Sequence, residues 1–345
     1  MKIKWGVIGS GGIARRRTIP EGIIPADNAV LVSVYDVDAS VNAQVAGQFG
    51  VYAANGIDDL LASDVDAVYI ATPAFLHCGQ VLQCAAAGKH ILCEKPLGMT
   101  IGQTEQMICA CKDAGVLLGT AFMMRFQSQH QAALKIIEQG RLGKPVFARA
   151  QLSCWYPPIE GAWRQDPAKG GGGAFMDLGG HCIDLLEMFF GKISKVSCFI
   201  NNTVHEYACE DSALANLFFE NGAMASVDTF FCIPDNSSKN ALELYGSKGS
   251  ILANGTIGQG QLGRMTAFLD EDNTLYDAAQ ARNTAGGIEI KPEPVNMYMA
   301  EVDEFSRAVI EHRIPSNSAQ IGLQSQKVIA ACYQSAIMGK IIELE

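Results

Sequence analysis

The stretch His90-Ile91-Leu92-Cys93-Glu94-Lys95-Pro96 reads as a short buried strand that ends in an acid, a base and a proline. Pro96 has no N–H to give to a neighbouring strand, so the strand should stop there. In an open parallel sheet, ligands bind beyond the carboxyl ends of the strands. The stretch therefore predicts that Glu94 and Lys95 emerge in a ligand-binding crevice.

A glycine-rich turn follows the first predicted strand. Residues 2–8 alternate into the apolar run Trp5-Gly6-Val7-Ile8-Gly9, which breaks into Gly9-Ser10-Gly11-Gly12-Ile13-Ala14 before a predicted helix. This G-x-G-x-x-A pattern puts glycines where the backbone approaches a pyrophosphate, and the small Ala14 where helix meets sheet. It predicts a dinucleotide site, although an ordinary glycine-rich turn would look the same. The residues expected to contact the dinucleotide here are Gly9, Gly11, Gly12 and Ile13.

The second predicted strand, residues 29–35, ends at Asp36. A carboxylate there can accept both ribose hydroxyls of the adenosine, and it repels a 2′-phosphate. Asp38 adds to this repulsion, so the sequence favours NAD over NADP. Two alternatives stay open: Asp36 is a solvated turn residue, or one cation of Arg15-Arg16-Arg17 serves a phosphate.

Strands and helices alternate through the first third of the chain, which is typical of βαβ units and a doubly wound parallel sheet. Further strands are predicted at residues 65–73 and 116–120. Helices are predicted at residues 41–49, 57–61, 78–87 and 100–114. We expect a Rossmann domain at residues 1–123.

The second half changes to short alternating strands joined by Gly/Asn loops, which predicts an α/β domain with an open, mostly antiparallel sheet at residues 124–345. Strands are expected at residues 146–153, 193–201, 212–219, 224–231, 241–245 and 340–344. Helices are expected at residues 129–138, from near 174, and at 297–311 and 319–338. Residues 253–294 give no assignment.

Composition limits the class of protein. A chain of 345 residues is long enough for two domains. Its net charge of −10 argues against binding nucleic acid. Eleven cysteines without a CxxC pair indicate a reduced, cytoplasmic setting. We expect neither a signal peptide nor a membrane span.

A second polar group lies in Gly170-Gly171-Gly172-Gly173-Ala174-Phe175-Met176-Asp177-Leu178-Gly179-Gly180-His181-Cys182-Ile183-Asp184. Asp177, His181 and Asp184 follow i, i+4, i+7 spacing and should share one face of a helix. A carboxylate one turn from an imidazole suits it for acid-base chemistry, and the glycines should leave room for a polar ligand. A buried, satisfied histidine is the plainer alternative. A metal would suit the three side chains, but no further ligand stands at the right spacing, so none is expected.

Aromatic residues precede the glycines. Trp163-Arg164 combines an aromatic ring with a cation, a common partner set for sugar hydroxyls, and Tyr156 lies shortly before it. Tryptophan and tyrosine are also ordinary packing residues, so substrate contact and packing both stay open.

Taken together, the glycine turn, Asp36, Thr72-Pro73 with His77, Glu94-Lys95-Pro96 and the segment around His181 resemble the glucose-fructose oxidoreductase and inositol 2-dehydrogenase family of NAD(P)-dependent oxidoreductases. The likeness covers essentially the whole chain, in the right order. It implies a Rossmann domain and a second domain whose sheet forms a homodimer or homotetramer interface.

The resemblance also implies roles for single residues. Lys95 would lie beside the nicotinamide and the substrate hydroxyl, and His181 would act as acid-base with Asp177 orienting it. The further cofactor residues it implies are Thr72, Pro73, His77 and Glu94. The substrate residues it implies are Arg125, Trp163, Arg164, Asp177 and His181. Trp163-Arg164 looks like the sugar-reductase members, which prefer NADP, and Asp36 departs from that pattern.

The predicted activity is reversible, NAD-dependent oxidation of a secondary alcohol on a sugar, sugar derivative or cyclitol. One alternative is a dihydrodiol or other non-sugar alcohol dehydrogenase on the same scaffold. Another is an NAD-binding redox sensor without catalysis, although such a sensor has no need of Lys95, Asp177 and His181 together.

Overall fold

The computed structural model describes residues 1–270 and 286–344. Its contacts divide the chain into two compact units. The first unit comprises Met1–Met123, Trp163–Gly171 and Asn296–Lys327. The second comprises Met124–Ala162, Gly172–Val295 and Val328–Glu345. The predicted second domain included residues 163–171 and 296–327, which the contacts group with the first unit.

The first unit contains a six-stranded parallel sheet in the order β3-β2-β1-β4-β5-β6. Its strands are β1 (Ile3–Ile8), β2 (Ala29–Tyr35), β3 (Tyr52–Ala53), β4 (Ala67–Ile70), β5 (His90–Cys93) and β6 (Leu118–Thr120). Every residue of β4 is buried, as expected for a strand covered on both faces. The predicted Rossmann fold is confirmed.

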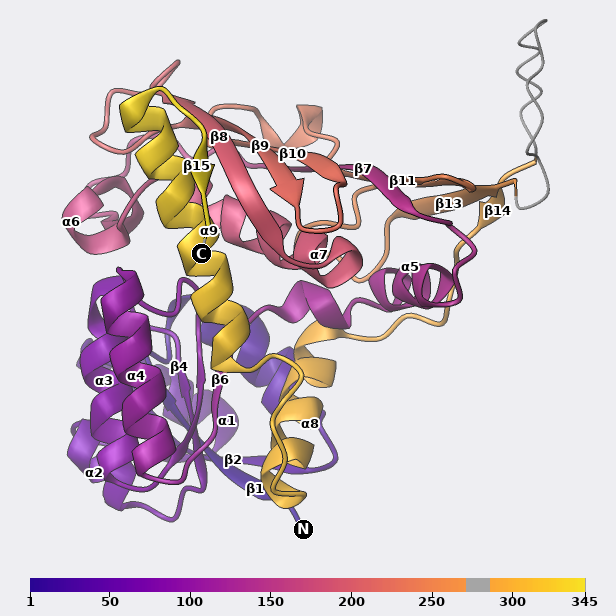
Figure 1. Cartoon of the computed structure of the whole chain (residues 1–345). Helices are drawn as coiled ribbons and strands as arrows, with labels where there is room; N and C mark the ends of the chain where they lie inside the picture. Colours follow the sequence, from indigo (N-terminus) through magenta and orange to yellow (C-terminus); the bar gives the residue numbers. More distant parts are fainter. Residues whose placement is uncertain (271–285, 345) are drawn as a thin grey trace, which may run out of the picture. The chain divides into compact units, whose positions relative to one another are not determined.

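Helices cover both faces of this sheet. One core packs η1 (Ala14–Ile23), α1 (Ala39–Phe49) and α8 (Met297–Ile310) against the strands, through side chains such as Ile19, Val45 and Phe305. The opposite core packs α2 (Ile57–Ala62), α3 (Ala74–Ala86) and α4 (Ile101–Asp113), and Figure 1 shows α3 and α4 side by side. The short η3 (Trp163–Gln165) and α6 (Pro167–Gly170) contact each other, and α6 also contacts α3.

Helix α8 joins the first unit through polar as well as apolar contacts. Trp5 packs on Phe305 and donates from Nε1 to Ser306 Oγ over 3.1 Å. Asn28 donates to the carbonyl of Asp303 over 2.9 Å. These partners lie some 300 residues apart, so the sequence predicted the helix but not the domain to which it belongs.

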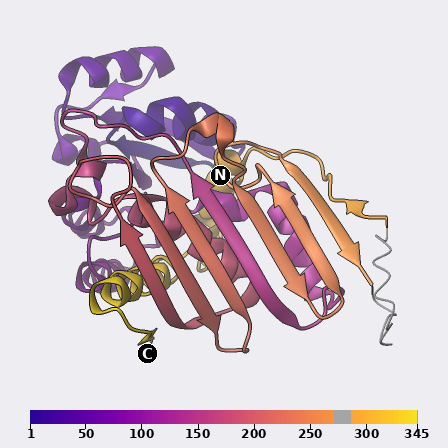
Figure 2. The same ribbon diagram turned by 90° about the horizontal axis from the view of Figure 1, so that it is seen from above.

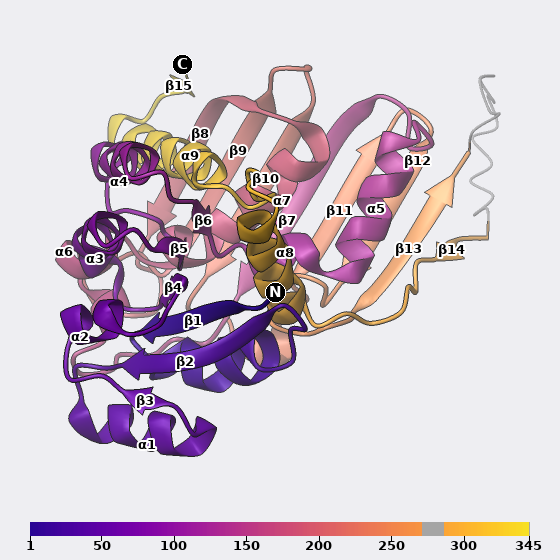
Figure 3. The same ribbon diagram turned by 90° about the horizontal axis from the view of Figure 1, so that it is seen from below.

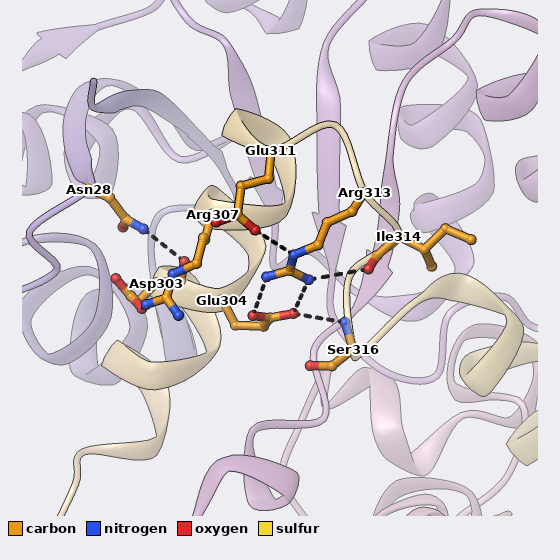
Figure 4. Close-up of polar contacts among 8 residues, drawn as sticks. All are labelled: Asn28, Asp303, Glu304, Arg307, Glu311, Arg313, Ile314 and Ser316. Atoms are coloured by element: carbon orange, nitrogen blue, oxygen red, sulfur yellow. Dashed lines mark hydrogen bonds and ion pairs between the residues drawn. The ribbon is translucent and has the colours of Figure 1, made fainter.

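An ion cluster fixes the loop that follows α8, as Figure 4 shows. The Arg313 guanidinium donates to both Glu304 oxygens over 2.7 and 2.8 Å, and to Glu311 over 2.7 Å. Glu304 also accepts from the main-chain N–H of Ser316 over 3.0 Å. The turn between α8 and α9 (Ala319–Met338) is therefore fastened to α8 itself.

The second unit contains a nine-stranded sheet in the order β14-β13-β12-β11-β7-β10-β9-β8-β15. Neighbouring strands are antiparallel except β7 and β10, which run parallel. Its strands are β7 (Pro145–Ser153), β8 (Ile193–Asn201), β9 (Ser212–Phe219), β10 (Met224–Phe230), β11 (Ala241–Gly246), β12 (Gly249–Asn254), β13 (Arg264–Leu269), β14 (Ile288–Glu289) and β15 (Ile342–Glu343). The predicted mostly antiparallel sheet is confirmed. The unassigned residues 253–294 supply β13, β14 and the end of β12, and residues 271–285 lie outside the described part.

Only one face of this sheet carries helices in the described part of the chain. Helices α5 (Ser128–Glu138) and α7 (Gly180–Phe190) lie on it, as Figure 3 shows, and α7 contacts β7 and β10. Figure 2 presents the other face, with the strands in front. Along β9, buried and exposed residues alternate, as expected for a sheet with one open face. The remaining short helices are η2 (Met123–Phe126), η4 (Phe175–Gly179) and η5 (Asp235–Ser237).

Candidate active site

The glycine turn of the first unit packs against the ends of β2 and β4. The N–H groups of Gly9 and Ser10 donate to the Tyr35 carbonyl over 2.8 and 3.2 Å. Gly9 has φ +80°, and a Cβ there would lie 2.8 Å from Thr72 Cγ2 and 2.9 Å from the Ala71 backbone. Glycine is therefore required at this position. The helix that follows, η1, is a π-helix rather than an ordinary α-helix.

Asp36 is held at this turn. Its Oδ2 accepts from the Gly11 N–H over 2.9 Å, and its Oδ1 accepts from the Asp38 N–H over 3.1 Å. Each carboxylate oxygen can accept more than one hydrogen bond, so Asp36 keeps acceptor capacity for ribose hydroxyls. Asp38 itself caps α1 by accepting from the N–H groups of Ser40 and Val41.

The arginine run has protein partners. Arg15 donates to Gln44 and Gln48 over 3.2 and 3.3 Å. Arg16 donates to the Gly12 carbonyl over 3.1 Å, and Arg17 pairs with Glu21 over 2.6 Å. These contacts fix the three side chains along η1 and α1.

Glu94 emerges after β5 and is gripped by a buried hydroxyl chain. Tyr69, from β4, donates to Glu94 Oε1 over 2.5 Å. Thr18, from η1, donates in turn to the Tyr69 hydroxyl over 2.9 Å. Burial raises the pKa of Glu94, while the Lys95 charge and the Tyr69 hydrogen bond oppose that rise. Tyr69 and Thr18 are not predicted from the sequence, because a tyrosine in a buried strand carries no sign of its partner.

His77 joins the loops that follow β4 and β5. Its Nδ1 lies 2.9 Å from the Pro96 carbonyl oxygen, and its Nε2 lies 2.9 Å from the Thr72 carbonyl oxygen. The ring is buried, and burial lowers the pKa of His77. Both ring nitrogens thus face the backbone. We expect any effect of His77 on a cofactor to pass through these loops.

Trp163 and Arg164 belong to the same unit as Glu94 and Lys95. The Arg164 guanidinium carbon lies 4.2 Å from the centre of the Trp163 ring, a cation–π contact. The Arg164 charge also contributes, after burial, Lys95 and Tyr69, to the pKa of Glu94, which it lowers. Arg164, a predicted substrate residue, therefore interacts electrostatically with Glu94, a predicted cofactor residue.

Asp177 and His181 lie in the second unit, on η4 and α7. The spacing predicted that Asp177 and His181 lie one regular α-helical turn apart. Because η4 is a π turn, the backbone between them is not regular α-helix. His181 is buried. The described residues contain no group of three histidine, cysteine or acidic side chains that could hold a metal ion.

Asp184 pairs with Arg125 rather than with His181. Arg125 Nη1 donates to Asp184 Oδ1 over 2.7 Å, and Asp184 is buried. Burial raises the pKa of Asp184 to about 6, against the opposing charge of Arg125. This ion pair fixes the guanidinium of Arg125, a predicted substrate residue.

The expectation that the glycines leave room for a ligand is wrong for two of them. A Cβ on Gly172 would overlap the Tyr333 hydroxyl, and a Cβ on Gly173 would overlap the Glu210 carbonyl oxygen. The space is filled by protein. Glu210 and Tyr333 are not predicted from the sequence, since neither lies near the glycine motif along the chain.

The comparisons with known proteins match both units. Residues 3–122 match the oxidoreductase family with an NAD-binding Rossmann fold, and residues 130–252 match the GFO/IDH/MocA C-terminal domain. The 1,5-anhydro-D-fructose reductase of Ensifer adhaerens is 30% identical over 346 residues, which cover 99% of this chain and 98% of that protein. The trans-1,2-dihydrobenzene-1,2-diol dehydrogenase of Mus musculus is 31% identical over 255 residues, which cover 72% and 74%.

A solved structure agrees with these relatives. The aldose-aldose oxidoreductase from Caulobacter crescentus, complexed with glycerol, superposes with a TM-score of 0.88 at 25% identity and covers 100% of both chains. The resemblance inferred from the sequence, the NAD-binding domain and the class of enzyme are confirmed. The chain belongs to the GFO/IDH/MocA family of oxidoreductases, and its first unit is the family's NAD-binding Rossmann domain.

Proposed function

We propose that the enzyme transfers hydride reversibly between a nicotinamide and a secondary alcohol or ketone of a sugar, sugar derivative or cyclitol. The observation that carries this proposal is the position of Glu94 and Lys95. They leave β5 at the carboxyl edge of the NAD-binding sheet, where ligands of such sheets bind. The relative with 1,5-anhydro-D-fructose reductase activity supports a sugar-like substrate.

The first unit offers fitting groups for NAD. Gly9, Gly11 and Gly12 carry no side chain in this turn, and Gly9 and Gly12 have positive φ, so the backbone is accessible to a pyrophosphate. Asp36 would accept the adenosine ribose hydroxyls, which favours NAD over NADP. Thr72, Pro73 and Glu94 would line the nicotinamide end, with Glu94 accepting from the second ribose.

The proposed chemistry gives a role to each catalytic and substrate residue that the family resemblance implies. Bound NAD supplies the hydride acceptor at C4 of its nicotinamide. His181 would take the hydroxyl proton as hydride leaves the same carbon, and Asp177 would stabilise the resulting imidazolium. Lys95 would polarise the substrate oxygen with its positive charge. Arg125, Trp163 and Arg164 would hold the other substrate hydroxyls.

The test is turnover of NAD with a panel of sugars, cyclitols and diols, followed at 340 nm. We expect His181→Ala and Lys95→Ala each to lose about 10²- to 10⁴-fold in kcat, the usual contribution of a positioned proton-transfer group. The exposed residues His312 and Lys112 supply controls, His312→Asn and Lys112→Ala, that should keep wild-type rates. Wild-type turnover by His181→Ala on every substrate would remove it from the mechanism.

A dihydrodiol dehydrogenase is the second candidate, because the mouse relative with that name is 31% identical over 72% of this chain. Faster turnover of a trans-dihydrodiol than of any sugar or cyclitol would favour it. If the wild-type protein binds NAD but reduces it with no member of the panel, the sensor alternative gains support.

We also propose that copies of the chain associate through the open face of the second-unit sheet. The exposed apolar side chains there include Phe199 paired opposite Leu214, and Met224 paired opposite Phe218. An exposed patch of this kind is typical of protein interfaces. A Phe199→Glu variant should lower the mass measured by light scattering; an unchanged mass would contradict this interface.

We also propose that the enzyme is located in the cytoplasm. All eleven cysteines are free thiols, as is usual in a reducing compartment. No helix of the described residues could span a membrane. Fractionation of cells that express a tagged copy would test the location.

A further inference from the structure

The helix that carries Asp177 and His181 needs a cap from elsewhere in the chain. The first N–H groups of a helix have no partner within it. Ala174, at the N-cap position, gives no side-chain hydrogen bond to the helix. The first intrahelical bond of this turn runs from the Asp177 N–H to the Gly173 carbonyl over 3.0 Å. The four N–H groups of residues 173–176 therefore need hydrogen-bond acceptors from outside the helix.

Glu210 meets three of these groups. Its two carboxylate oxygens each lie 2.9 Å from the Gly173 nitrogen, and Oε1 accepts from the Phe175 N–H over 3.0 Å. Its main-chain carbonyl accepts from the Ala174 N–H over 3.0 Å. The side chain is buried. A carboxylate at a helix N-terminus is also favoured by the helix dipole.

Tyr333 meets the fourth group and fixes Glu210. Its hydroxyl donates to Glu210 Oε1 over 2.7 Å and accepts from the Met176 N–H over 3.2 Å. One hydroxyl thus links the cap to the helix. All four N–H groups are satisfied by two side chains and one carbonyl.

The glycines make this cap fit. Any Cβ at Gly172 or Gly173 would overlap Tyr333 or Glu210. Two consecutive residues without side chains let the cap reach the backbone directly. The glycine run is therefore matched to the cap in this unit.

We propose that Glu210 and Tyr333 are positioning residues, which set the place of Asp177 and His181 by fixing the start of their helix. The π turn Phe175–Gly179 begins within the capped stretch and ends shortly before His181. Hydrogen bonding changes register within this turn, so the helix itself does not define one fixed start. The cap supplies that reference. This inference rests on the proposed function of His181 as acid-base.

Two variants test the cap. Glu210→Gln removes the charge and places amide hydrogens among N–H donors, and Tyr333→Phe removes one donor and one acceptor. Amide hydrogen exchange should become at least tenfold faster at residues 173–176 in both variants. Tyr52→Phe is the matched control, because Tyr52 also donates to a carboxylate, Asp59, at the exposed surface of the other unit.

Kinetics then separate positioning from stability. We expect kcat to fall about tenfold in Tyr333→Phe and about a hundredfold in Glu210→Gln, since small misplacements of reacting groups cost rates of this size. The Kd for NAD, measured by fluorescence on folded protein, should stay within twofold of wild type. The acid limb of the kcat profile should also move, because the orientation of Asp177 to His181 changes.

Unchanged hydrogen exchange in both variants would overturn the cap. Faster exchange with unchanged kcat and pH profile would overturn the positioning role. The proposed function is tested separately: it fails if His181→Ala keeps the wild-type kcat. In that case the hydrogen-exchange measurement still tests whether Glu210 and Tyr333 cap the helix. If Glu210→Gln does not fold, Tyr333→Phe decides alone, since it changes only one hydroxyl.

Discussion

Each unit contains a tyrosine that donates a hydrogen bond to a glutamate, but the two glutamates differ in their other hydrogen-bond donors. In the first unit Tyr69 donates to Glu94 over 2.5 Å, and in the second Tyr333 donates to Glu210 over 2.7 Å. Glu210 also accepts two backbone N–H groups fixed in the fold. Glu94 accepts one weaker bond, from the Lys95 N–H over 3.3 Å.

The two carboxylates differ in how many protein N–H and O–H groups they accept from, and this number bears on whether each one has a structural or a binding role. The acceptor capacity of Glu210 is used by the helix that it caps, so that residue is a structural reference. Glu94 accepts from the Tyr69 hydroxyl and the Lys95 N–H, and the proposed ribose contact would use its remaining acceptor capacity. We therefore expect the number of protein donors, rather than burial alone, to distinguish the capping residue Glu210 from the proposed cofactor residue Glu94.

The largest effect should come from a substitution that disrupts the contact between Gly173 and Glu210. In Gly173→Ala the new Cβ meets the Glu210 carbonyl, which is backbone and moves little. We expect a loss of about 2–3 kcal/mol in the free energy of unfolding, typical of overpacking, measured by urea denaturation. Gly47→Ala is the control: its Cβ meets nothing within 4 Å on α1, so it should stabilise by about 0.5–1 kcal/mol. Equal effects at both glycines would remove the distinction.

The second largest effect should come from removing the charge of Glu94. Glu94→Gln should raise the Kd for NAD about tenfold, since a hydrogen bond to a charged group contributes roughly 1.5–3 kcal/mol, and should leave the unfolding free energy nearly unchanged. Titration of the protein with NAD, followed by fluorescence, measures the first quantity. A large loss of stability with normal NAD affinity would make Glu94 another cap.

The pH dependence of NAD binding sharpens the same point. In the proposed site the ionised form of Glu94 would accept the ribose hydroxyls, and burial raises the pKa of Glu94. Affinity should therefore be full above this raised pKa and fall as the pH drops through it. Tyr69→Phe removes a hydrogen bond that lowers the pKa of Glu94, so the fall in NAD affinity should move to higher pH. An unshifted profile in that variant would contradict the role of Tyr69.

The smallest effect should come from the exposed cluster at Arg313 (Figure 4). Its side chain is 37% exposed and pairs with Glu304 and Glu311, and solvent weakens such pairs. Arg313→Gln should lower the unfolding free energy by about 1 kcal/mol or less, without changing kcat or the Kd for NAD. A larger loss than that of Gly173→Ala would reverse the order that burial predicts.

Much of the site could be predicted, because its motifs are local. The turn at Gly9, the carboxylate Asp36 and the pair Glu94-Lys95 each follow a strand directly, so their place at the carboxyl edge follows from the parallel sheet. The spacing around His181 predicted the helix but not its π turn.

The sequence by itself determined the alternation of strands and helices, the two-part chain and the family, since hydrophobic periodicity and short motifs are written in neighbouring residues. Only the tertiary structure decided the partners of those motifs. Glu210 lies 37 residues from Gly173, and Tyr333 lies 157 residues from Met176. Hydrogen bonds between such distant residues leave no periodic pattern, so they become visible only when the fold brings donor and acceptor together.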